Sequence, residues 1–371
     1  MKILMVGKYF YPVLGGVELH MQNLAYELVK KGHDVEVFAS NEDFKDEKLS
    51  TKDEIEGIKI RRFLNVFSLC RGILNSDCDV IHYHLFRKVY VDASIIAGKI
   101  TGKPLVFTPH CVYPPQSLFM KVAKKAYDSS FGHLSLALVD TIVALTENDK
   151  SDIIAVGASP NKIEIVPNSI RFEKFRNLVS GESFRNKYGV DRFLLYVGRI
   201  DWNKGLEHVI QAMPNLKKLG LKFVIVGEDV GYRAKLDELI DRLNLRHDVT
   251  FTGKISEDML FSAYAACTLF ILPAFYEGLP TVVLEAMAYR KPVIAAKTGG
   301  TKYVIKHGHN GFLIEYGDPG NICDVVKEAL DSDLMSIGEN AKKDVEVNYT
   351  WEKSAEKIEQ IYEGLLSRDL K

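Results

Sequence analysis

Hydrophobic and polar positions alternate in a regular order along this 371-residue chain, with short apolar runs separated by amphipathic stretches. This order is typical of parallel β-α-β units. In the first half it predicts strands at 2–8, 35–39, 58–62, 79–84, 104–108, 141–145 and 163–166, and helices at 16–31, 63–75, 88–101, 118–138 and 147–156. In the second half it predicts strands at 193–198, 222–227, 249–252, 269–272, 292–296 and 311–314, and helices at 205–219, 231–244, 256–267, 280–290, 299–307 and 319–331.

Two segments interrupt this order. Residues 41–57 are highly charged and predict an exposed loop, and residues 167–183 have little regular pattern and predict a linker between domains. We therefore expect an α/β protein with two doubly wound, Rossmann-like domains, at 1–168 and 169–350. Open sheets of this kind bind ligands at the carboxyl ends of their strands, so two facing domains would form a cleft. The end of the chain, 351–371, has a different pattern: Trp351, Ala355, Ile358, Tyr362 and Leu365 lie on one face of a long helix.

Composition agrees with a globular protein of this kind. Hydrophobic content is 47% and charged content is 26%, and a net charge of −1 gives no field that would attract nucleic acid. The five cysteines are scattered without a C-x-x-C pair, which favours the reduced cytoplasm. The first residues resemble a strand and not a secretory signal, and the apolar run at 263–275 is too short to span a membrane. We expect a soluble protein, or one peripheral to the inner membrane surface.

The apolar stretch "FYEGLPTVVLEAM" (275–287) contains two acids, Glu277 and Glu285. Pro280 suits the first turn of a helix, so the helix is expected to begin near Leu279 or Pro280. Glu277 then lies in the preceding loop and Glu285 in the second turn. The N–H groups between them favour an anion. This order suits a ligand with a hydroxylated group, a phosphate and a second hydroxylated group, as in a nucleotide sugar.

Further ligand-binding groups follow other predicted strands. Arg199 and Lys204 follow the strand in "LLYVGRIDWNKG", where two cations can clamp a diphosphate. The strands in "LKFVIVGED" and "VTFTGKIS" end in Gly227 and Gly253, which leave room there for a flat base against the backbone.

In the first half, Gly15 and Gly16 open a predicted helix and allow backbone to approach a phosphate, although a plain strand-to-helix turn explains them too. Their spacing is not the G-x-G-x-x-G of nicotinamide-binding proteins. His110, in "FTPHC", follows a strand and is expected to face the cleft.

Two other patterns have ordinary explanations. His82 and His84 share a strand face and Asp77 and Asp79 precede it, but core histidines and a strand entry account for them without a metal. His307 and His309 fit a turn by the same logic. The predicted helix 118–138 groups Lys121, Lys124 and Lys125, which fits either a membrane-surface helix or a half-buried helix with a solvated basic face.

Together these segments resemble the retaining, nucleotide-sugar-dependent glycosyltransferases with two Rossmann-like domains, the GT-B fold, in the group called glycosyltransferase family 4 or glycosyl transferases group 1. The resemblance spans the chain in order, through "GGVE" (15–18), "TPH" (108–110), "VPNS" (166–169), "YVGRIDWNKG" (196–205), "VIVGE" (224–228), "EGLPTVVLEAMAYRKPVIA" (277–295), "GG" (299–300) and "HGHNGFLI" (307–314). The two glutamates of "EGLPTVVLE", with seven residues between them, are its most specific feature.

The resemblance implies a role for each candidate residue. Arg199 and Lys204 would bind the diphosphate, and Glu285 would bind the ribose diol. Glu277 would meet the donor sugar, together with His110 from the other domain. The remaining donor-binding positions would be Gly15, Gly16, Gly227, Lys254, Ile255, Gly278, Leu279, Pro280 and Thr281. The final helix would cross back onto the first domain, and neither a cofactor nor a metal would be required.

This chain departs from the family pattern at two positions. Tyr303 stands where many members have a glutamate, and Ser169 stands where "PNG" would have glycine. The first departure puts an acid role in that loop in doubt, and the second a positive φ at 169.

The resemblance implies transfer of a sugar from a UDP-sugar or GDP-mannose to an acceptor hydroxyl of a glycan or a lipid-linked intermediate. Two alternatives remain open: a nucleotide-sugar 2-epimerase, which would need a further acid/base pair that the sequence does not show, and a non-catalytic nucleotide-sugar-binding relative, which would be expected to lack Arg199, Lys204 or Glu277.

Overall fold

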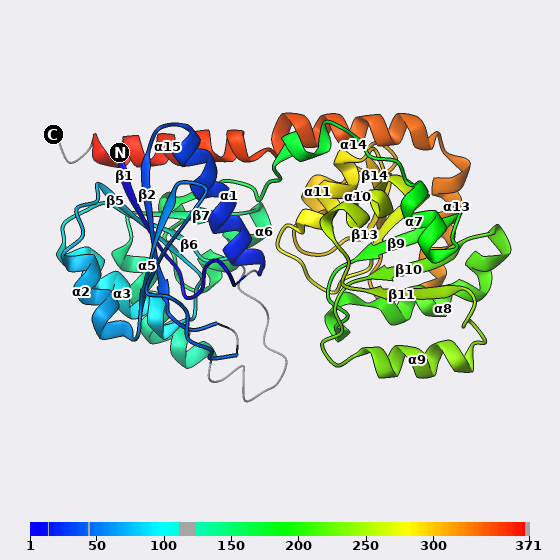
Figure 1. The fold of residues 1–371 in the computed structure, drawn as a ribbon, viewed down its shortest axis with the longest axis horizontal. Helices are drawn as coiled ribbons and strands as arrows, with labels where there is room; N and C mark the ends of the chain where they lie inside the picture. Colours follow the sequence, from blue (N-terminus) through cyan, green and yellow to red (C-terminus); the bar gives the residue numbers. More distant parts are fainter. Residues whose placement is uncertain (14, 44, 111–123, 368–371) are drawn as a thin grey trace. The chain divides into compact units, whose positions relative to one another are not determined.

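The computed structural model describes residues 1–13, 15–43, 45–110 and 124–367. The chain divides into two compact units, each with its own core (Figure 1). Unit 1 comprises residues 1–169 and 351–371, and unit 2 comprises residues 170–350. The sequence analysis expects the division one residue earlier, between residues 168 and 169.

Unit 1 is built on an eight-stranded sheet. Its strands, in spatial order, are β3 (Lys52–Ile55), β4 (Ile58–Phe63), β2 (Asp34–Ser40), β1 (Lys2–Val6), β5 (Val80–His84), β6 (Leu105–Thr108), β7 (Thr141–Ala144) and β8 (Ile163–Ile165). All neighbours are parallel except the edge pair β3 and β4. The chain leaves β1 toward β2 and later returns to β5, so the strand order reverses between β1 and β5. Ligands bind at such a switch point in doubly wound sheets.

Helices cover both faces of this sheet. They are α1 (Gly16–Lys30), α2 (Val66–Leu74), α3 (Val89–Ile100), the π-helical turn η1 (Asp128–Gly132), α5 (His133–Leu138), α6 (Glu147–Ala155), the short η2 (Pro160–Lys162) and α15 (Trp351–Leu366). Because successive strand residues point to opposite faces, Leu4 and Val6 join a core with α2, α3, α5 and α6, while Ile3 and Met5 join a core with α1 and α15. Helix α15 contacts α1, and its buried residues belong to a core of unit 1, the unit onto which the sequence analysis expects the last helix to cross back.

Unit 2 contains a six-stranded parallel sheet. Its strands, in spatial order, are β11 (Val249–Gly253), β10 (Lys222–Val226), β9 (Phe193–Val197), β12 (Leu269–Leu272), β13 (Val293–Ala296) and β14 (Gly311–Ile314). The order reverses between β9 and β12. The loops that follow these two strands are therefore the expected ligand-binding loops of unit 2.

The helical segments of unit 2 also contact one another. They are η3 (Phe172–Phe175), α7 (Glu182–Tyr188), η4 (Trp202–Lys204), α8 (Leu206–Leu216), η5 (Lys217–Leu219), α9 (Arg233–Arg242), α10 (Glu257–Ala266), α11 (Thr281–Ala288), α12 (Thr301–Val304), α13 (Pro319–Asp331) and α14 (Leu334–Asn348). Helix α8 contacts α9 and α13, α10 contacts α7, and α11 contacts α14. Strands β9, β12 and β13 are wholly buried, whereas the edge strand β11 is mostly half-buried.

The structure corrects several predicted segments. The charged stretch 41–57 contains the short strand β3, an exposed edge on which charged side chains are tolerated. The predicted linker contains η3 and the start of α7, and α14 was not predicted. The helix expected at 299–307 is confined to α12, because the chain turns at 307–309.

The basic helix 118–138 is only partly described. Residues 118–123, including Lys121, lie outside the described residues, as does Cys111. The part from 124 onward is helical but is interrupted by the π-helical turn η1, which the apolar pattern does not predict.

Candidate functional site

The candidate site of unit 2 lies at its switch point. Arg199 and Lys204 follow β9, and Glu277 follows β12, which pairs with β9 in the sheet. The side chains of Lys204 and Glu277 form an ion pair, with 12% and 15% of their side-chain surfaces exposed. The structure therefore brings two predicted site residues from distant parts of the sequence into contact.

Backbone contacts hold the Glu277 loop in place. The N–H of Gly300 donates to the Glu277 carbonyl at 2.8 Å. Gly299 has a φ of +51°, and a Cβ there would come within 1.9 Å of the same carbonyl oxygen. The two glycines at 299–300 are thus explained by close backbone approach, and they fix where Glu277 presents its side chain.

Arg199 is positioned by the strand that precedes it. The hydroxyl of Tyr196, a buried residue of β9, donates to the Arg199 carbonyl at 2.8 Å. Burial raises the pKa of Tyr196 well above its usual value, and the charge of Glu277 raises it further. This hydroxyl therefore stays protonated and serves as a fixed donor.

The expected base-binding side is formed by the ends of β9, β10 and β11. A Cβ at Gly227 would lie 1.9 Å from the Gly198 carbonyl oxygen, and the Gly227 N–H donates to the Gly253 carbonyl at 3.1 Å. Lys254 is exposed, while Ile255 is partly buried against the core. The glycine at 227 thus lets two strand ends meet without side chains between them.

Helix α11 begins where the sequence predicts. Pro280 is its N-cap residue, with extended backbone, and Thr281 is its first residue. No side chain caps this end, and the first turn contains no acid. Gly278 and Leu279 lie in the loop between Glu277 and the helix start. The Val283 N–H donates to the Pro280 carbonyl at 3.2 Å, so the N–H groups of Thr281 and Val282 are the ones available to an anion.

Glu285 lies in the second turn of α11, as predicted. The Tyr264 hydroxyl donates to its carboxylate at 2.7 Å. Burial raises the pKa of Glu285 above its usual value, and the Tyr264 hydrogen bond partly opposes this shift. The carboxylate is thus held in one orientation and remains a hydrogen-bond acceptor when ionised.

In unit 1, Gly15 and Gly16 lie at the start of α1, beside the switch point. A Cβ at Gly16 would meet no atom within 4 Å. The buried Glu18 also belongs to this turn: burial raises its pKa, while hydrogen bonds from the N–H groups of Glu18 and Gly15 lower it. Part of the anion-binding capacity expected here is therefore used by the protein's own carboxylate, which the sequence prediction did not foresee.

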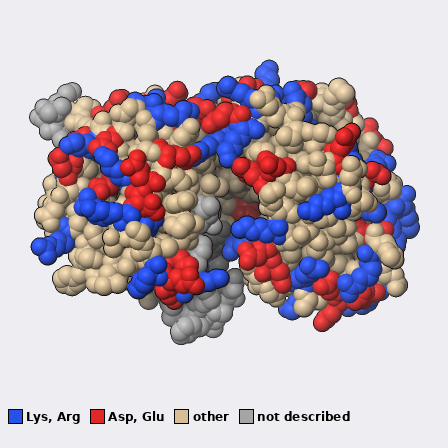
Figure 2. Space-filling view, viewed as in Figure 1, with Lys and Arg blue, Asp and Glu red and all other residues tan. Residues whose placement is uncertain are grey.

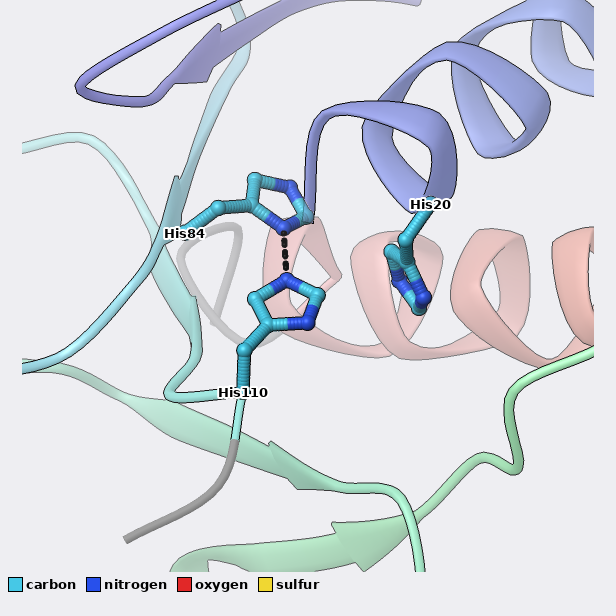
Figure 3. Close-up of side chains that lie close together, drawn as sticks. All are labelled: His20, His84 and His110. Atoms are coloured by element: carbon cyan, nitrogen blue, oxygen red, sulfur yellow. Dashed lines mark hydrogen bonds between the residues drawn. The ribbon is translucent and has the colours of Figure 1, made fainter. Parts of the chain in front are cut away.

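His110 belongs to a cluster of histidines in unit 1 (Figure 3). His84 Nδ1 and His110 Nε2 share a hydrogen bond of 3.0 Å, and the His20 ring packs edge-on against His110 with centroids 4.5 Å apart. His110 has a φ of +57°, which is uncommon for a residue with a side chain and often marks a functional site. The sequence analysis did not identify His20 as a site residue. Its position on α1, four residues after Gly16, is the sequence feature that could have indicated it.

The wider surroundings of the cluster are apolar or neutral. His20 lies 3.3 Å from the Asn168 side chain and packs edge-on against Trp351 of α15. Burial lowers the pKa of His20 to about 4, and it lowers those of His84 and His110 well below the usual value. The imidazoles are therefore neutral at pH 7.

His20, His84 and His110 each place one ring nitrogen within 4.8 Å of the others, so these three residues could hold a metal ion. The pair named from the sequence, His82 and His84, could not. His82 bonds to the Tyr362 hydroxyl at 2.6 Å and to the Thr108 hydroxyl at 2.8 Å, and both its nitrogens are thereby used. His82 is a satisfied core histidine.

Other sequence features have structural roles. Asp77 pairs with Lys2, and Asp79 accepts a hydrogen bond from the Lys2 N–H, so both join the amino ends of the central strands β1 and β5. Ser169 has no positive φ; its hydroxyl bonds to that of Ser354 on α15 at 2.8 Å. Tyr303 on α12 is 43% exposed.

Charges of both signs are interspersed over the face in Figure 2, and none of the described helices is both long and apolar enough to cross a membrane.

Comparison with known proteins then identifies the family. The description "Glycosyl transferases group 1" matches residues 182–344, and "Glycosyltransferase Family 4" matches residues 14–174. An uncharacterized glycosyltransferase of Methanocaldococcus jannaschii is 30% identical over 98% of both chains. The chain belongs to this glycosyltransferase family. The GPI3 subunit of phosphatidylinositol N-acetylglucosaminyltransferase from Saccharomyces cerevisiae is 22% identical, over 98% of this chain and 83% of that protein.

Solved structures show the same fold. HepE from Anabaena, in complex with UDP and glucose, is 20% identical and superposes with a TM-score of 0.80 over 98% of this chain and 100% of its own. The two parallel α/β units of this glycosyltransferase are therefore the Rossmann-like domains of the GT-B fold. The fold class expected from the sequence is confirmed.

Proposed function

We propose that this glycosyltransferase transfers a sugar from a nucleotide-sugar donor, a UDP-sugar or GDP-mannose, to an acceptor hydroxyl. The observation that supports this most strongly is the switch point of unit 2. There Arg199 and Lys204 follow β9, Lys204 pairs with Glu277, and Glu277 precedes the start of α11, which no side chain caps. Cations and free N–H groups suit a diphosphate, and a carboxylate suits sugar hydroxyls.

In this proposal the donor extends along unit 2. The base lies on the backbone at Gly227 and beside Lys254 and Ile255. The ribose diol donates to Glu285, whose carboxylate is oriented by Tyr264. The diphosphate contacts Arg199, Lys204 and the backbone from Gly278 to Thr281, which leads into α11, and Glu277 accepts from the donor sugar. HepE, which shares the fold, is described in complex with UDP and glucose and with UDP-glucose, and these ligands motivate the choice of donor class.

Unit 1 would supply His110 to the sugar and Gly16 to the phosphate. The open space beside Gly16 and the constrained backbone of His110 support these roles. His84 would act as a positioning residue, because its hydrogen bond fixes the His110 ring.

We propose a retaining, metal-independent reaction. The bond between the anomeric carbon and the diphosphate oxygen breaks, and its electron pair leaves with the diphosphate. The acceptor oxygen forms the new bond on the same face, and its proton passes to the departing phosphate oxygen. Hydrogen bonds to charged groups contribute about 1.5–3 kcal/mol each, against roughly 0.3–2 kcal/mol for a helix dipole, so Arg199 and Lys204 would provide most of the stabilisation.

The rival route is a double displacement with Glu277 as nucleophile. The position of Glu277 in an ion pair with Lys204 argues against it, because a carboxylate that is held by a cation is a weaker nucleophile. Product stereochemistry by NMR tests retention, and mass spectrometry tests for a covalent sugar adduct on Glu277. Inversion, or a trapped adduct, would contradict the proposed mechanism.

The acceptor is proposed to be a glycan or a lipid-linked intermediate in surface polysaccharide or glycolipid synthesis, with a contact to the membrane near 118–138. Lys124 and Lys125 are the described cations of that segment. The yeast relative named above, a phosphatidylinositol N-acetylglucosaminyltransferase subunit, is named for a lipid acceptor.

Thermal-shift screening against UDP- and GDP-sugars tests the donor proposal. A donor at a hundredfold excess over its Kd stabilises the folded protein by about 2.7 kcal/mol. We expect one nucleotide class to raise the unfolding temperature and Lys204→Ala to abolish this rise. Lys218→Ala, at an exposed lysine beyond the far end of α8, is the matched control. No shift with any nucleotide sugar would contradict the proposal.

A further inference from the structure

Large apolar side chains are exposed on neighbouring helices of unit 1. Eight of the 18 large hydrophobic side chains that are exposed among the described residues lie on, or directly beside, α2, α3 and the η1–α5 segment. They are Leu64, Phe67, Leu74, Val89, Ile96, Ile100, Phe131 and Leu134. Phe67 is 90% exposed and Ile100 is 70% exposed. Such a concentration of apolar side chains differs from the scattered single residues of an ordinary surface.

These side chains share one side of the unit. Phe67 and Leu74 are seven residues apart on α2, and Val89, Ile96 and Ile100 recur at helical spacing on α3, so each set lies on one helix face. Helix α3 contacts α2, α5 and η1. The opposite faces of these helices enter one core against the same face of the sheet (Figure 1). Their outer faces therefore point away from the sheet together. We call this surface the α2–α3–α5 face.

The exposed charges on the α2 and α3 parts of this face are positive. In 64–75 and 88–103 the only acid is Asp92, which is buried and accepts a hydrogen bond from Tyr127. The exposed cations of these segments are Arg71, Lys88 and Lys99, of which Lys99 pairs with Asp140. Apolar side chains that are surrounded by cations, without exposed acids, complement a surface that is apolar inside and anionic outside.

A basic hollow adjoins this face. It is lined by Arg87, Lys124, Lys125 and His133, together with Asp128 and Ser129 among others. Both oxygens of Asp128 accept hydrogen bonds from Arg87, at 2.9 and 2.7 Å, so this acid is already neutralised. The two lysines leave the hollow with a net positive charge, which suits the phosphate of a lipid headgroup.

We propose that the α2–α3–α5 face docks on a lipid bilayer that contains anionic lipids. Phe67, Ile100 and their apolar neighbours enter the interface between headgroups and acyl chains. Arg71, Lys88 and Lys125 contact the phosphates. The docking surface is therefore centred on α2 and α3 and extends beyond Lys124 and Lys125. This inference rests on the proposed function in one respect: docking would give the enzyme access to a lipid-linked acceptor. Binding to the bilayer itself does not require transferase activity.

Co-sedimentation of the full chain with vesicles tests this proposal. One vesicle type is phosphatidylcholine alone, and the other contains about one third phosphatidylglycerol. We expect binding to the second type that weakens with added salt, and much weaker binding to the first. The double variant Phe67→Ser, Ile100→Ser should lose binding, and each of Arg71→Gln, Lys88→Gln and Lys125→Gln should weaken it about fivefold.

Met335→Ser is the matched control, because Met335 is 80% exposed on α14 of unit 2 and lies outside this face. All the variants should keep the thermal shift caused by the donor. A failure of the docking proposal is thereby distinguished from a failure of the donor proposal. Absence of vesicle binding by the unaltered protein, or binding that survives the double variant, would overturn the inference. Self-association that the double variant abolishes, without vesicle binding, would assign the face to a protein contact instead.

Discussion

Lys204 and Glu277 neutralise each other at the switch point of unit 2. A bound donor would give each residue its own partner, because the diphosphate attracts Lys204 and the sugar hydroxyls donate hydrogen bonds to Glu277. The sequence assigned both residues to the donor but did not reveal that they contact each other. Two loops meet in the fold here, and nothing in either segment alone encodes the distance between them.

Replacement of Glu277 separates binding of the diphosphate from transfer. We expect Glu277→Gln to keep or strengthen the affinity for the nucleoside diphosphate, because Lys204 loses its neutralising partner. Transfer should fall by about a hundredfold, because the sugar loses a positioning acceptor. Calorimetry and initial rates measure the two effects. Glu238→Gln, at an exposed acid of α9, should change neither, and a parallel loss of affinity and rate in Glu277→Gln would count against this division of roles.

The ionisation of Glu285 predicts a pH dependence for the donor. Burial raises the pKa of this carboxyl, so it becomes protonated at a higher pH than an ordinary glutamate. Only the ionised form accepts both ribose hydroxyls, so donor affinity should fall as the pH decreases through this raised pKa. Tyr264→Phe removes the hydrogen bond that opposes the shift and should move the fall to higher pH. The Kd measured across pH for both proteins checks this; an unchanged midpoint in Tyr264→Phe would contradict it.

At the scale of helices and strands, the apolar pattern predicts the parallel strands and most of the helices. Each such helix buries one stripe of apolar side chains, and each such strand is a short apolar run. Strand β3 (Lys52–Ile55) escapes prediction because its first three residues are charged and exposed at a sheet edge. Helix α14 escapes because its buried positions include Gly338 and Ala341, which are too small to stand out among charged neighbours. Such segments are fixed by contacts with the rest of the unit, which no local pattern records.

The contact between α14 and α11 predicts a stability effect at Gly338. A Cβ there would lie 2.2 Å from the Arg290 carbonyl oxygen, just after the end of α11. Gly338→Ala should therefore lower the free energy of unfolding by about 1–3 kcal/mol. Gly364→Ala on α15, where a Cβ meets nothing within 4 Å, should instead raise it by up to about 1 kcal/mol. Denaturant unfolding of both variants distinguishes these signs; equal effects would show that the contact does not constrain α14.

At the scale of the whole molecule, unit 1 buries neutral histidines inside its core and unit 2 does not. His82, whose pKa burial lowers to about 3, remains neutral in the folded protein at pH 5. In the unfolded chain a histidine binds a proton below about pH 6.5. The unfolded state thus binds more protons between these values, and stability must fall as the pH decreases through this window.

Replacement of His82 tests this linkage. When the pH falls from 7 to 5, the neutral His82 lowers the free energy of unfolding by about 2 kcal/mol, because one pKa unit corresponds to about 1.4 kcal/mol. His82→Asn should lower the free energy of unfolding at pH 7. Between pH 7 and pH 5, however, the free energy of unfolding of this variant should fall by about 2 kcal/mol less than that of the unaltered protein. His133→Asn, at an exposed histidine of α5, is the control. Urea unfolding at both pH values checks the difference, and equal losses in all three proteins would contradict it.

The central claim is that the switch point of unit 2 binds the diphosphate of a nucleotide sugar, and titration calorimetry tests it most directly. For the nucleotide class selected by thermal shift, the nucleoside diphosphate and monophosphate are compared on the unaltered protein and on Arg199→Ala, Lys204→Ala. We predict much tighter binding of the diphosphate by the unaltered protein and nearly equal, weak binding of both nucleotides by the double variant. A double variant that still prefers the diphosphate as strongly as the unaltered protein would contradict the claim.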